Sequence, residues 1–179
     1  MYLFASVLSA AIYGKEVREI QVEADVSDGL PSFAMVGFPS AQVREAQERV
    51  RTAFKNNRLC LPPKKVTVNF APADMKKEGA GFDLPVAAAV LAAAGILEPD
   101  LLKGVMIVGE ISLNGEIHGV AGVLPRVIRA RELGLRFCVI PEENIREGNL
   151  VKDMPVFGVK SLNDMIRCLR DPNTYTAAY

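Results

Sequence analysis

The longest apolar pattern lies in the middle of the chain. Residues 84–97 are almost entirely apolar, a run too long for an ordinary strand and shorter than the ~20 residues of a membrane-spanning helix. We therefore predict a buried helix there, with Asp83 capping its first unpaired N–H groups and Gly95 supplying a left-handed stop. Directly upstream, residues 66–70 alternate β-branched or aromatic side chains with polar ones, which predicts a strand.

The N-terminal third is dominated by two-residue alternation. Residues 2–13 and 17–26 predict two strands joined by a tight hairpin, and residues 32–37 predict a third short strand. The apolar start has no basic region of the kind that opens a signal peptide, so we interpret it as a strand. A helix is predicted over residues 41–57, where apolar positions recur at three-and-four spacing and Ser40 stands at the N-cap.

The second half mixes short apolar strands with helices. The Asn114-Gly115 pair, with alternating residues on both sides, is the strongest local signal of a β-hairpin. Residues 171–179 have no apolar period and are interpreted as a linker or tail behind a domain spanning residues 1–170. Together the elements favour an α+β two-layer fold with a mixed sheet and packed helices. The other expected elements are strands at 104–109, 136–140 and 156–159 and helices at 122–133 and from residue 161.

Composition narrows the class of protein. Hydrophobic residues make up 50% and charged residues 23%, which is typical of a globular chain and excludes disorder. Lys+Arg and Asp+Glu balance at 21 each, so binding to nucleic acid would have to be local, and no membrane partner is expected. Three widely spaced cysteines without a CxxC pair favour reduced thiols, and hence a cytoplasmic location, over disulfides or a zinc site.

Residue patterns alone indicate no catalytic, cofactor or metal site. The Gly-rich loop at 79–83 lacks the GxxxxGK[ST] spacing of a phosphate-binding loop, and an acidic residue at the helix start would repel phosphate. Asp74, Glu78 and Asp83 could hold a divalent cation, but capping and loop solvation explain these carboxylates better. A lone histidine, His118, is more often a hydrogen-bonded structural residue than a base.

Two long motifs carry a family resemblance. Residues 28–57, DGLPSF through KN, and residues 67–87, TVNFAPADMKKEGAGFDLPVA, resemble the N-terminal region of ComM/YifB-type magnesium-chelatase-like AAA+ ATPases. That region is in turn similar to the Lon proteolytic-domain fold. The resemblance implies an ATP-driven, hexameric, DNA-binding motor, in the ComM case for branch migration in natural transformation and competence. ATP and magnesium would belong to an AAA+ domain, because the 179 residues contain no Walker A motif.

The resemblance also implies that Lon-type peptidase chemistry is absent. Gly81 stands where active Lon-type proteases have their serine, and Leu124 stands where they have their lysine. Neither side chain can act as nucleophile or base. We therefore expect the Lon-like fold without the peptidase site, and no bound cofactor in these residues.

The leading hypothesis is a non-catalytic domain that contributes DNA contact, subunit assembly or coupling. Its expected partners are its own AAA+ domain, the neighbouring subunits of a homohexamer, and DNA. One alternative is a Lon-type serine peptidase or hydrolase that uses a displaced pair, Ser112 with Lys77 or Lys76. Another is a stand-alone DNA-binding module with salt-sensitive affinity. The candidate DNA or partner contacts are Lys64, Lys65, Lys76, Lys77 and Arg126.

Overall fold

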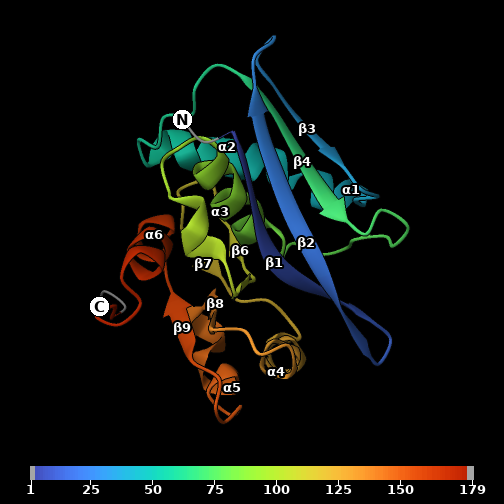
Figure 1. The fold of residues 1–179 in the computed structure, drawn as a ribbon, viewed down its shortest axis with the longest axis vertical. Helices are drawn as coiled ribbons and strands as arrows, with labels where there is room; N and C mark the ends of the chain where they lie inside the picture. Colours follow the sequence, from blue (N-terminus) through green and yellow to red (C-terminus); the bar gives the residue numbers. More distant parts are fainter. Residues whose placement is uncertain (1–2, 177–179) are drawn as a thin grey trace.

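A seven-stranded mixed sheet organises the computed structural model, which describes residues 3–176 (Figure 1). The strand order is β3-β4-β2-β1-β5-β8-β9, and a separate two-stranded ribbon pairs β6 with β7. The predicted α+β fold with a mixed sheet is confirmed. The strands are β1 (Phe4–Tyr13), β2 (Glu16–Ser27), β3 (Ser32–Val36), β4 (Lys65–Ala71), β5 (Val105–Ile107), β6 (Glu110–Ile111), β7 (Ile117–His118), β8 (Phe137–Pro141) and β9 (Val156–Val159).

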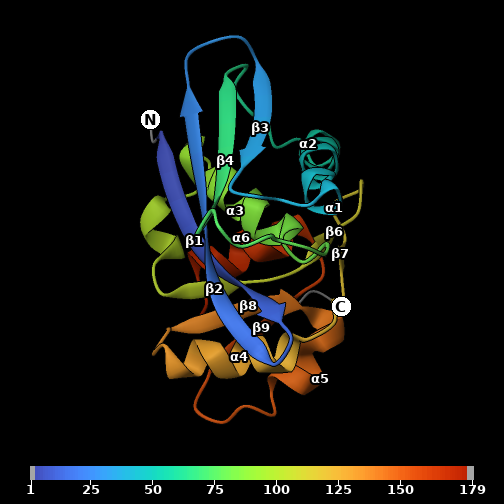
Figure 2. The same ribbon diagram turned by 90° about the vertical axis from the view of Figure 1, so that its right-hand side faces the viewer.

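Helices cover both faces of the sheet. On one face, α2, α3 and α6 pack with the inward side chains of β1, β2 and β4 into the main core. On the other face, α4 packs over β5 and β8 in a second, smaller cluster (Figure 2). The helices are α1 (Ala41–Arg44), α2 (Ala46–Asn56), α3 (Asp83–Ala93), α4 (Val123–Glu132), α5 (Ile145–Gly148) and α6 (Leu162–Arg170), with 3-10 turns η1 (Pro99–Leu102) and η2 (Glu142–Asn144).

The N-terminal hairpin is the longest ladder of the sheet. β1 and β2 pair antiparallel from Phe4 opposite Asp25 to Tyr13 opposite Glu16, as the alternating pattern predicts. β1 also pairs in parallel with β5, through Leu8 and Met106. This distant pairing joins the antiparallel half of the sheet, β2 and β4, to the parallel half, β5, β8 and β9.

The central helix α3 is buried along its whole length, as its apolar run predicts. It ends earlier than predicted, at Ala93, and Gly95 with φ of +82° supplies the expected left-handed stop. The predicted cap by Asp83 is wrong. Phe82 occupies the N-cap, and the Asp83 carboxylate bonds outside the helix, to Arg49 and to the backbone N–H of Ile111.

The predicted helix over 41–57 is two segments, α1 and α2, separated at Glu45. The chain tightens there, because the N–H of Glu48 donates to the Glu45 carbonyl three residues back, at 3.1 Å. The N-cap at Ser40 is confirmed, since its Oγ accepts from the N–H of Val43 at 3.1 Å.

The end of the described chain packs on the domain. The Tyr175 hydroxyl donates to the Gly158 carbonyl at 2.8 Å, and its ring meets that of Phe157 edge-on. The last part of the predicted tail, residues 177–179, lies outside the described residues, as do residues 1 and 2. Among the helices between residues 3 and 176, none has the length and apolarity needed to cross a bilayer.

Candidate functional site

Two loops resemble those of the Lon-type site: a first loop, which contains Gly81, and a second loop, which precedes α4. They meet in the structure. A Cβ atom added at Gly81 would lie 3.9 Å from the Val120 side chain, and the Gly81 carbonyl accepts from the N–H of Gly109 at 3.0 Å. Leu124 is the second residue of α4, and its side chain packs with the second core cluster. The two positions expected to correspond to the Lon-type serine and lysine are therefore a glycine on one loop and a leucine at the start of α4, and neither side chain is a nucleophile or a base.

The second loop is held by one short segment of chain, η2 and the start of α5. The Asn144 side chain accepts from the N–H of Val120 at 3.0 Å and donates to the Val120 carbonyl at 2.9 Å. Glu147 accepts from the N–H of Leu124 at 3.3 Å, which satisfies a free donor at the start of α4. The loop is consequently a fixed part of the domain.

The first loop leads into Asp83, whose carboxylate forms a buried ion pair with Arg49. Arg49 of α2 reaches Asp83 with two bonds, Nε to Oδ2 at 2.7 Å and a terminal nitrogen to Oδ1 at 2.9 Å. Burial raises the pKa of Asp83, while the bonds from Arg49 and from the N–H of Ile111 act in the opposite direction. The two-point geometry holds the carboxylate in its charged form, so this pair locks the start of α3 to α2.

This geometry does not fit a nucleotide phosphate at the start of α3. The N–H of Leu84 already donates to the Gly109 carbonyl at 3.0 Å, and the N–H of Asp83 donates to the Ala80 carbonyl at 3.3 Å. The carboxylate there adds negative charge. Within residues 3–176, no three His, Cys, Asp or Glu side chains gather as a metal-binding group.

Lys77 is fully buried, and its bonds hold two loops together. Its ammonium donates to the carbonyls of Gly37, at 2.7 Å, and of Pro72. Its backbone N–H and carbonyl bond to Phe38 and Ser40, at 3.0 and 2.8 Å. Lys77 thereby holds the loop after β3 against the loop after β4, and burial lowers its pKa.

Arg126 is also engaged with backbone. Its Nε donates to the Ala10 carbonyl at 2.9 Å, and one terminal nitrogen donates to the carbonyls of Ala121 and Gly122, at 2.7 and 2.9 Å. Burial lowers the pKa of Arg126. The guanidinium therefore ties α4 to β1.

The five predicted contact residues do not form one patch. Lys64 and Lys65 lie at the start of β4, and Lys76 and Lys77 lie beyond its end, about 20 Å away for a seven-residue strand. Lys64 pairs with Asp28 at 3.0 Å, and Lys76 pairs with Glu78 at 3.5 Å. Lys65 and Lys76 are exposed. A DNA contact through these residues stays a prediction, centred on the lysines at the surface.

The Ser112 pair considered from sequence has a different partner. Both lysines are committed elsewhere, Lys77 to backbone carbonyls and Lys76 to Glu78. The Ser112 hydroxyl instead meets Nε2 of His118, and Nδ1 of His118 lies 3.6 Å from the Glu143 carboxylate. The Asn-Gly hairpin could have indicated the first contact, because it places residues 112 and 118 on one face. Glu143 comes from a distant turn.

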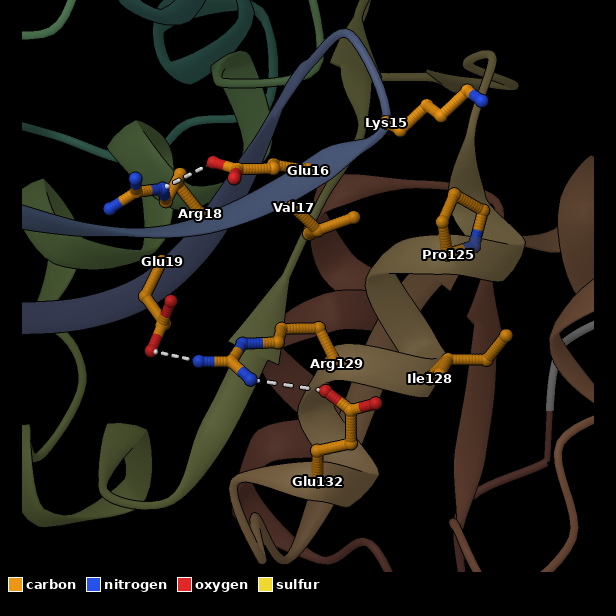
Figure 3. A pocket seen from close by; sticks show the side chains of 9 residues that line it. All are labelled: Lys15, Glu16, Val17, Arg18, Glu19, Pro125, Ile128, Arg129 and Glu132. Atoms are coloured by element: carbon orange, nitrogen blue, oxygen red, sulfur yellow. Dashed lines mark hydrogen bonds and ion pairs between the residues drawn. The ribbon is translucent and has the colours of Figure 1, made fainter.

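A pocket of about 600 Å³ lies between the β1–β2 hairpin and α4 (Figure 3). Arg129 crosses its floor, with one terminal nitrogen 2.9 Å from Glu19 and the other 3.0 Å from Glu132. Arg18 pairs with Glu16 at 3.1 Å on the rim. The lining has three cations, Lys15, Arg18 and Arg129, and three carboxylates, Glu16, Glu19 and Glu132, so the pocket offers no net charge to a ligand.

The cysteines carry no reactive site in the interior. Cys138 and Cys168 are buried, and burial raises the pKa of each thiol to about 12. A thiol with such a pKa is protonated at neutral pH and is a poor nucleophile. Cys60 is exposed and free, as the prediction of reduced thiols requires.

The similarity to known proteins identifies the family of this chain. Residues 22–144, more than half of the chain, match the family described as subunit ChlI of Mg-chelatase. The chain belongs to the Mg-chelatase ChlI family. This membership confirms the predicted resemblance to magnesium-chelatase-like AAA+ proteins.

The chain is similar to ComM and YifB proteins and, at lower identity, to Lon proteases. The chain is 39% identical over 165 residues to the competence protein ComM of Haemophilus influenzae, covering 92% of the chain and 32% of ComM. It is 40% identical over 145 residues to the uncharacterized protein YifB of Escherichia coli, covering 81% of the chain and 28% of YifB. Lon protease 2 of Bacillus subtilis is 26% identical over 151 residues, covering 75% of the chain and 27% of the protease. The chain spans about a third of the length of these curated relatives.

Proposed function

We propose that this chain is the N-terminal domain of a ComM/YifB-type AAA+ ATPase and that it is non-catalytic at its Lon-type position. The proposal rests on the 39% identity to ComM, in an alignment that covers 92% of the chain. Gly81 on its loop and Leu124 at the start of α4, the positions that resemble the Lon-type serine and lysine, support the absence of peptidase chemistry. ATP and Mg²⁺ would act in another part of the protein, a cytoplasmic homohexameric DNA motor for branch migration in natural transformation.

Within such a motor, the domain would contribute subunit assembly, coupling or DNA contact. The placement of basic residues favours assembly or coupling. Lys77 is fully buried, Arg126 is bonded to three carbonyls, and the exposed Lys65 and Lys76 stand at opposite ends of β4. An extended DNA backbone needs several adjacent cations to release counterions, and these residues supply no such row.

DNA binding over a salt series tests the proposal. The 179-residue chain and the full-length protein would each be titrated with single-stranded and branched DNA, with and without ATP. We expect salt-dependent binding by the full-length protein only. Binding by the 179-residue chain alone, with a salt slope reduced in Lys65→Ala or Lys76→Ala, would favour a DNA-contacting arm instead. Lys103→Ala is the matched control, because Lys103 is an exposed lysine paired with Asp100 elsewhere on the domain.

If neither protein bound DNA, the DNA-motor part of the proposal would be wrong. Family membership would remain, because it rests on the sequence match and not on DNA. Oligomer mass of the full-length protein, measured by light scattering, separates assembly from coupling. Loss of the hexamer when residues 1–170 are deleted would assign the domain to assembly, and a hexamer with uncoupled ATP hydrolysis would assign it to coupling.

A further inference from the structure

A serine, a histidine and a carboxylate stand in line on the surface next to the second loop. The β6–β7 hairpin buries Ile111 and Ile117 on one face and turns Ser112 and His118 to the other. Because the N–H of Ser112 donates to the Glu116 carbonyl at 2.9 Å, the ladder continues past β6. The serine hydroxyl and Nε2 of His118 are thereby in hydrogen-bond contact.

The carboxylate is positioned from outside the hairpin. One oxygen of Glu143 accepts from the N–H of Gly119 at 3.1 Å, and the other lies 3.6 Å from Nδ1 of His118. The first bond fixes the carboxylate beside the residue that follows the histidine. A carboxylate facing Nδ1 favours the tautomer with its proton there, which leaves Nε2 free to accept the serine proton.

A pocket adjoins this row at the end formed by His118 and Glu143. About 590 Å³ of open space is lined by His118 and Glu143 on one side and by the β9–α6 turn on the other. That volume suits a small molecule. Its charged lining residues are four carboxylates, from Glu116, Glu142, Glu143 and Asp164, and one ammonium, from Lys160; Asp164 is already paired with Arg167 at 3.1 Å, which leaves three carboxylates against one ammonium. The excess of negative charge favours a ligand that carries a positive charge.

We propose that Ser112, His118 and Glu143 form an acyl-transfer site that hydrolyses small esters carrying a cationic group. This activity goes beyond the proposed function, which gives the domain no reaction at its Lon-type position. Ser112 Oγ attacks the ester carbonyl carbon, and His118 Nε2 takes the hydroxyl proton. The proton then passes to the departing alkoxide as the C–O bond breaks, which leaves an acyl-serine. Water, deprotonated by the same nitrogen, hydrolyses the acyl-serine and restores the hydroxyl.

The hairpin tip can stabilise the oxyanion of this reaction. The backbone N–H groups of Leu113 and Asn114 donate no hydrogen bond to any residue between 3 and 176. The N–H that follows the nucleophile is a common oxyanion donor in serine hydrolases. Glu143 is a positioning residue, since it acts through His118.

Labelling of the 179-residue chain with a fluorophosphonate probe, followed by peptide mass spectrometry, tests the nucleophile without any substitution. We expect the label on Ser112. Ester hydrolysis through the acyl-serine should be abolished in Ser112→Ala, which lacks the nucleophile, and should fall on the order of 100-fold in His118→Asn, the usual contribution of a general base. Glu143→Gln should lower kcat by a larger factor than it raises KM, because Glu143 acts through His118 and is one of several carboxylates that line the pocket. Ser6→Ala, at a half-buried serine of β1 away from the hairpin, is the control expected to keep full activity.

Two matched substrates test the charge preference, the acetate esters of 4-(trimethylammonio)phenol and of 4-hydroxybenzoate, each normalised to its spontaneous hydrolysis. We expect the cationic ester to be preferred and the preference to decrease in Glu142→Gln. A chain that takes no label, or whose label maps away from Ser112, would overturn the site. Labelling of Ser112 that is unchanged in His118→Asn would overturn the base, and preference for the anionic ester would overturn the substrate class.

Discussion

Arg49 and Asp83 join α2 to the start of α3 by two hydrogen bonds, 2.7 and 2.9 Å long, at a carboxylate that is only 1% exposed. The same carboxylate accepts from the N–H of Ile111 at 3.0 Å, so one side chain connects two helices and the β6–β7 hairpin. The loop that contains Gly81 leads directly into this helix. The pair therefore fixes the position of that loop relative to the rest of the domain.

Replacing Arg49 should lower the stability of the domain far more than the partial exposure of this side chain suggests. Arg49→Ala leaves the buried Asp83 charge without its partner, and we expect a loss of about 3–5 kcal/mol in the free energy of unfolding by urea. Arg51→Ala is the control, because Arg51 pairs with Glu48 at the exposed surface and should change stability by less than about 1 kcal/mol. Equal losses in the two variants would contradict a dominant role for the buried pair.

Gly37 should tolerate no side chain. Its φ is +93°, and an added Cβ would lie 2.2 Å from the carbonyl oxygen of Phe70 in the neighbouring strand. Gly37→Ala combines backbone strain with a clash against backbone, so we expect a loss of at least about 3 kcal/mol or failure to fold. At Gly14, φ is +62° and nothing lies within 4 Å of an added Cβ. Gly14→Ala should therefore cost only about 1–2 kcal/mol. Thermal unfolding of both variants compares the two glycines.

The local pattern of the chain predicted most of the elements and little of the site. Ser40 and Gly95 act as predicted, because capping and left-handed stops depend on a few adjacent residues. Asp83 was predicted as a cap, but a tertiary partner 34 residues away takes its carboxylate. The Ser112–His118 contact follows from the hairpin, whereas the approach of Glu143 depends on the packing of η2 against the second loop. Such long-range placements leave no periodic signal in a single sequence.

Lys77 should matter for stability and not for DNA. Lys77→Met removes both side-chain bonds to the carbonyls of Gly37 and Pro72, and we expect a loss of about 1–3 kcal/mol in the free energy of unfolding. Lys76→Met should stay within about 0.5 kcal/mol, because that side chain is exposed. If the full-length protein binds DNA, Lys77→Met should leave the salt slope of binding unchanged. A reduced slope in a stably folded variant would show that Lys77 contacts phosphate.

The ion pair between Glu19 and Arg129 should make the hairpin's hold on α4 depend on pH. The hydrogen bond from Arg129 lowers the pKa of Glu19 in the folded chain. The unfolded chain then takes up a proton more readily than the folded chain. The contribution of Glu19 to stability is therefore complete above about pH 4.3, the usual value for an unfolded glutamate, and is lost as pH falls through the folded-state pKa.

Glu19→Gln should accordingly be less stable than the natural chain at neutral pH, and this difference should disappear in acid. Urea unfolding between about pH 6 and about pH 2 measures it. Glu16→Gln, on the same hairpin but at a carboxylate that is 68% exposed, should show no such convergence. A Glu19→Gln difference that stayed constant over this range would mean that Arg129 is held by Glu132 and by packing, and that the charge of Glu19 contributes nothing.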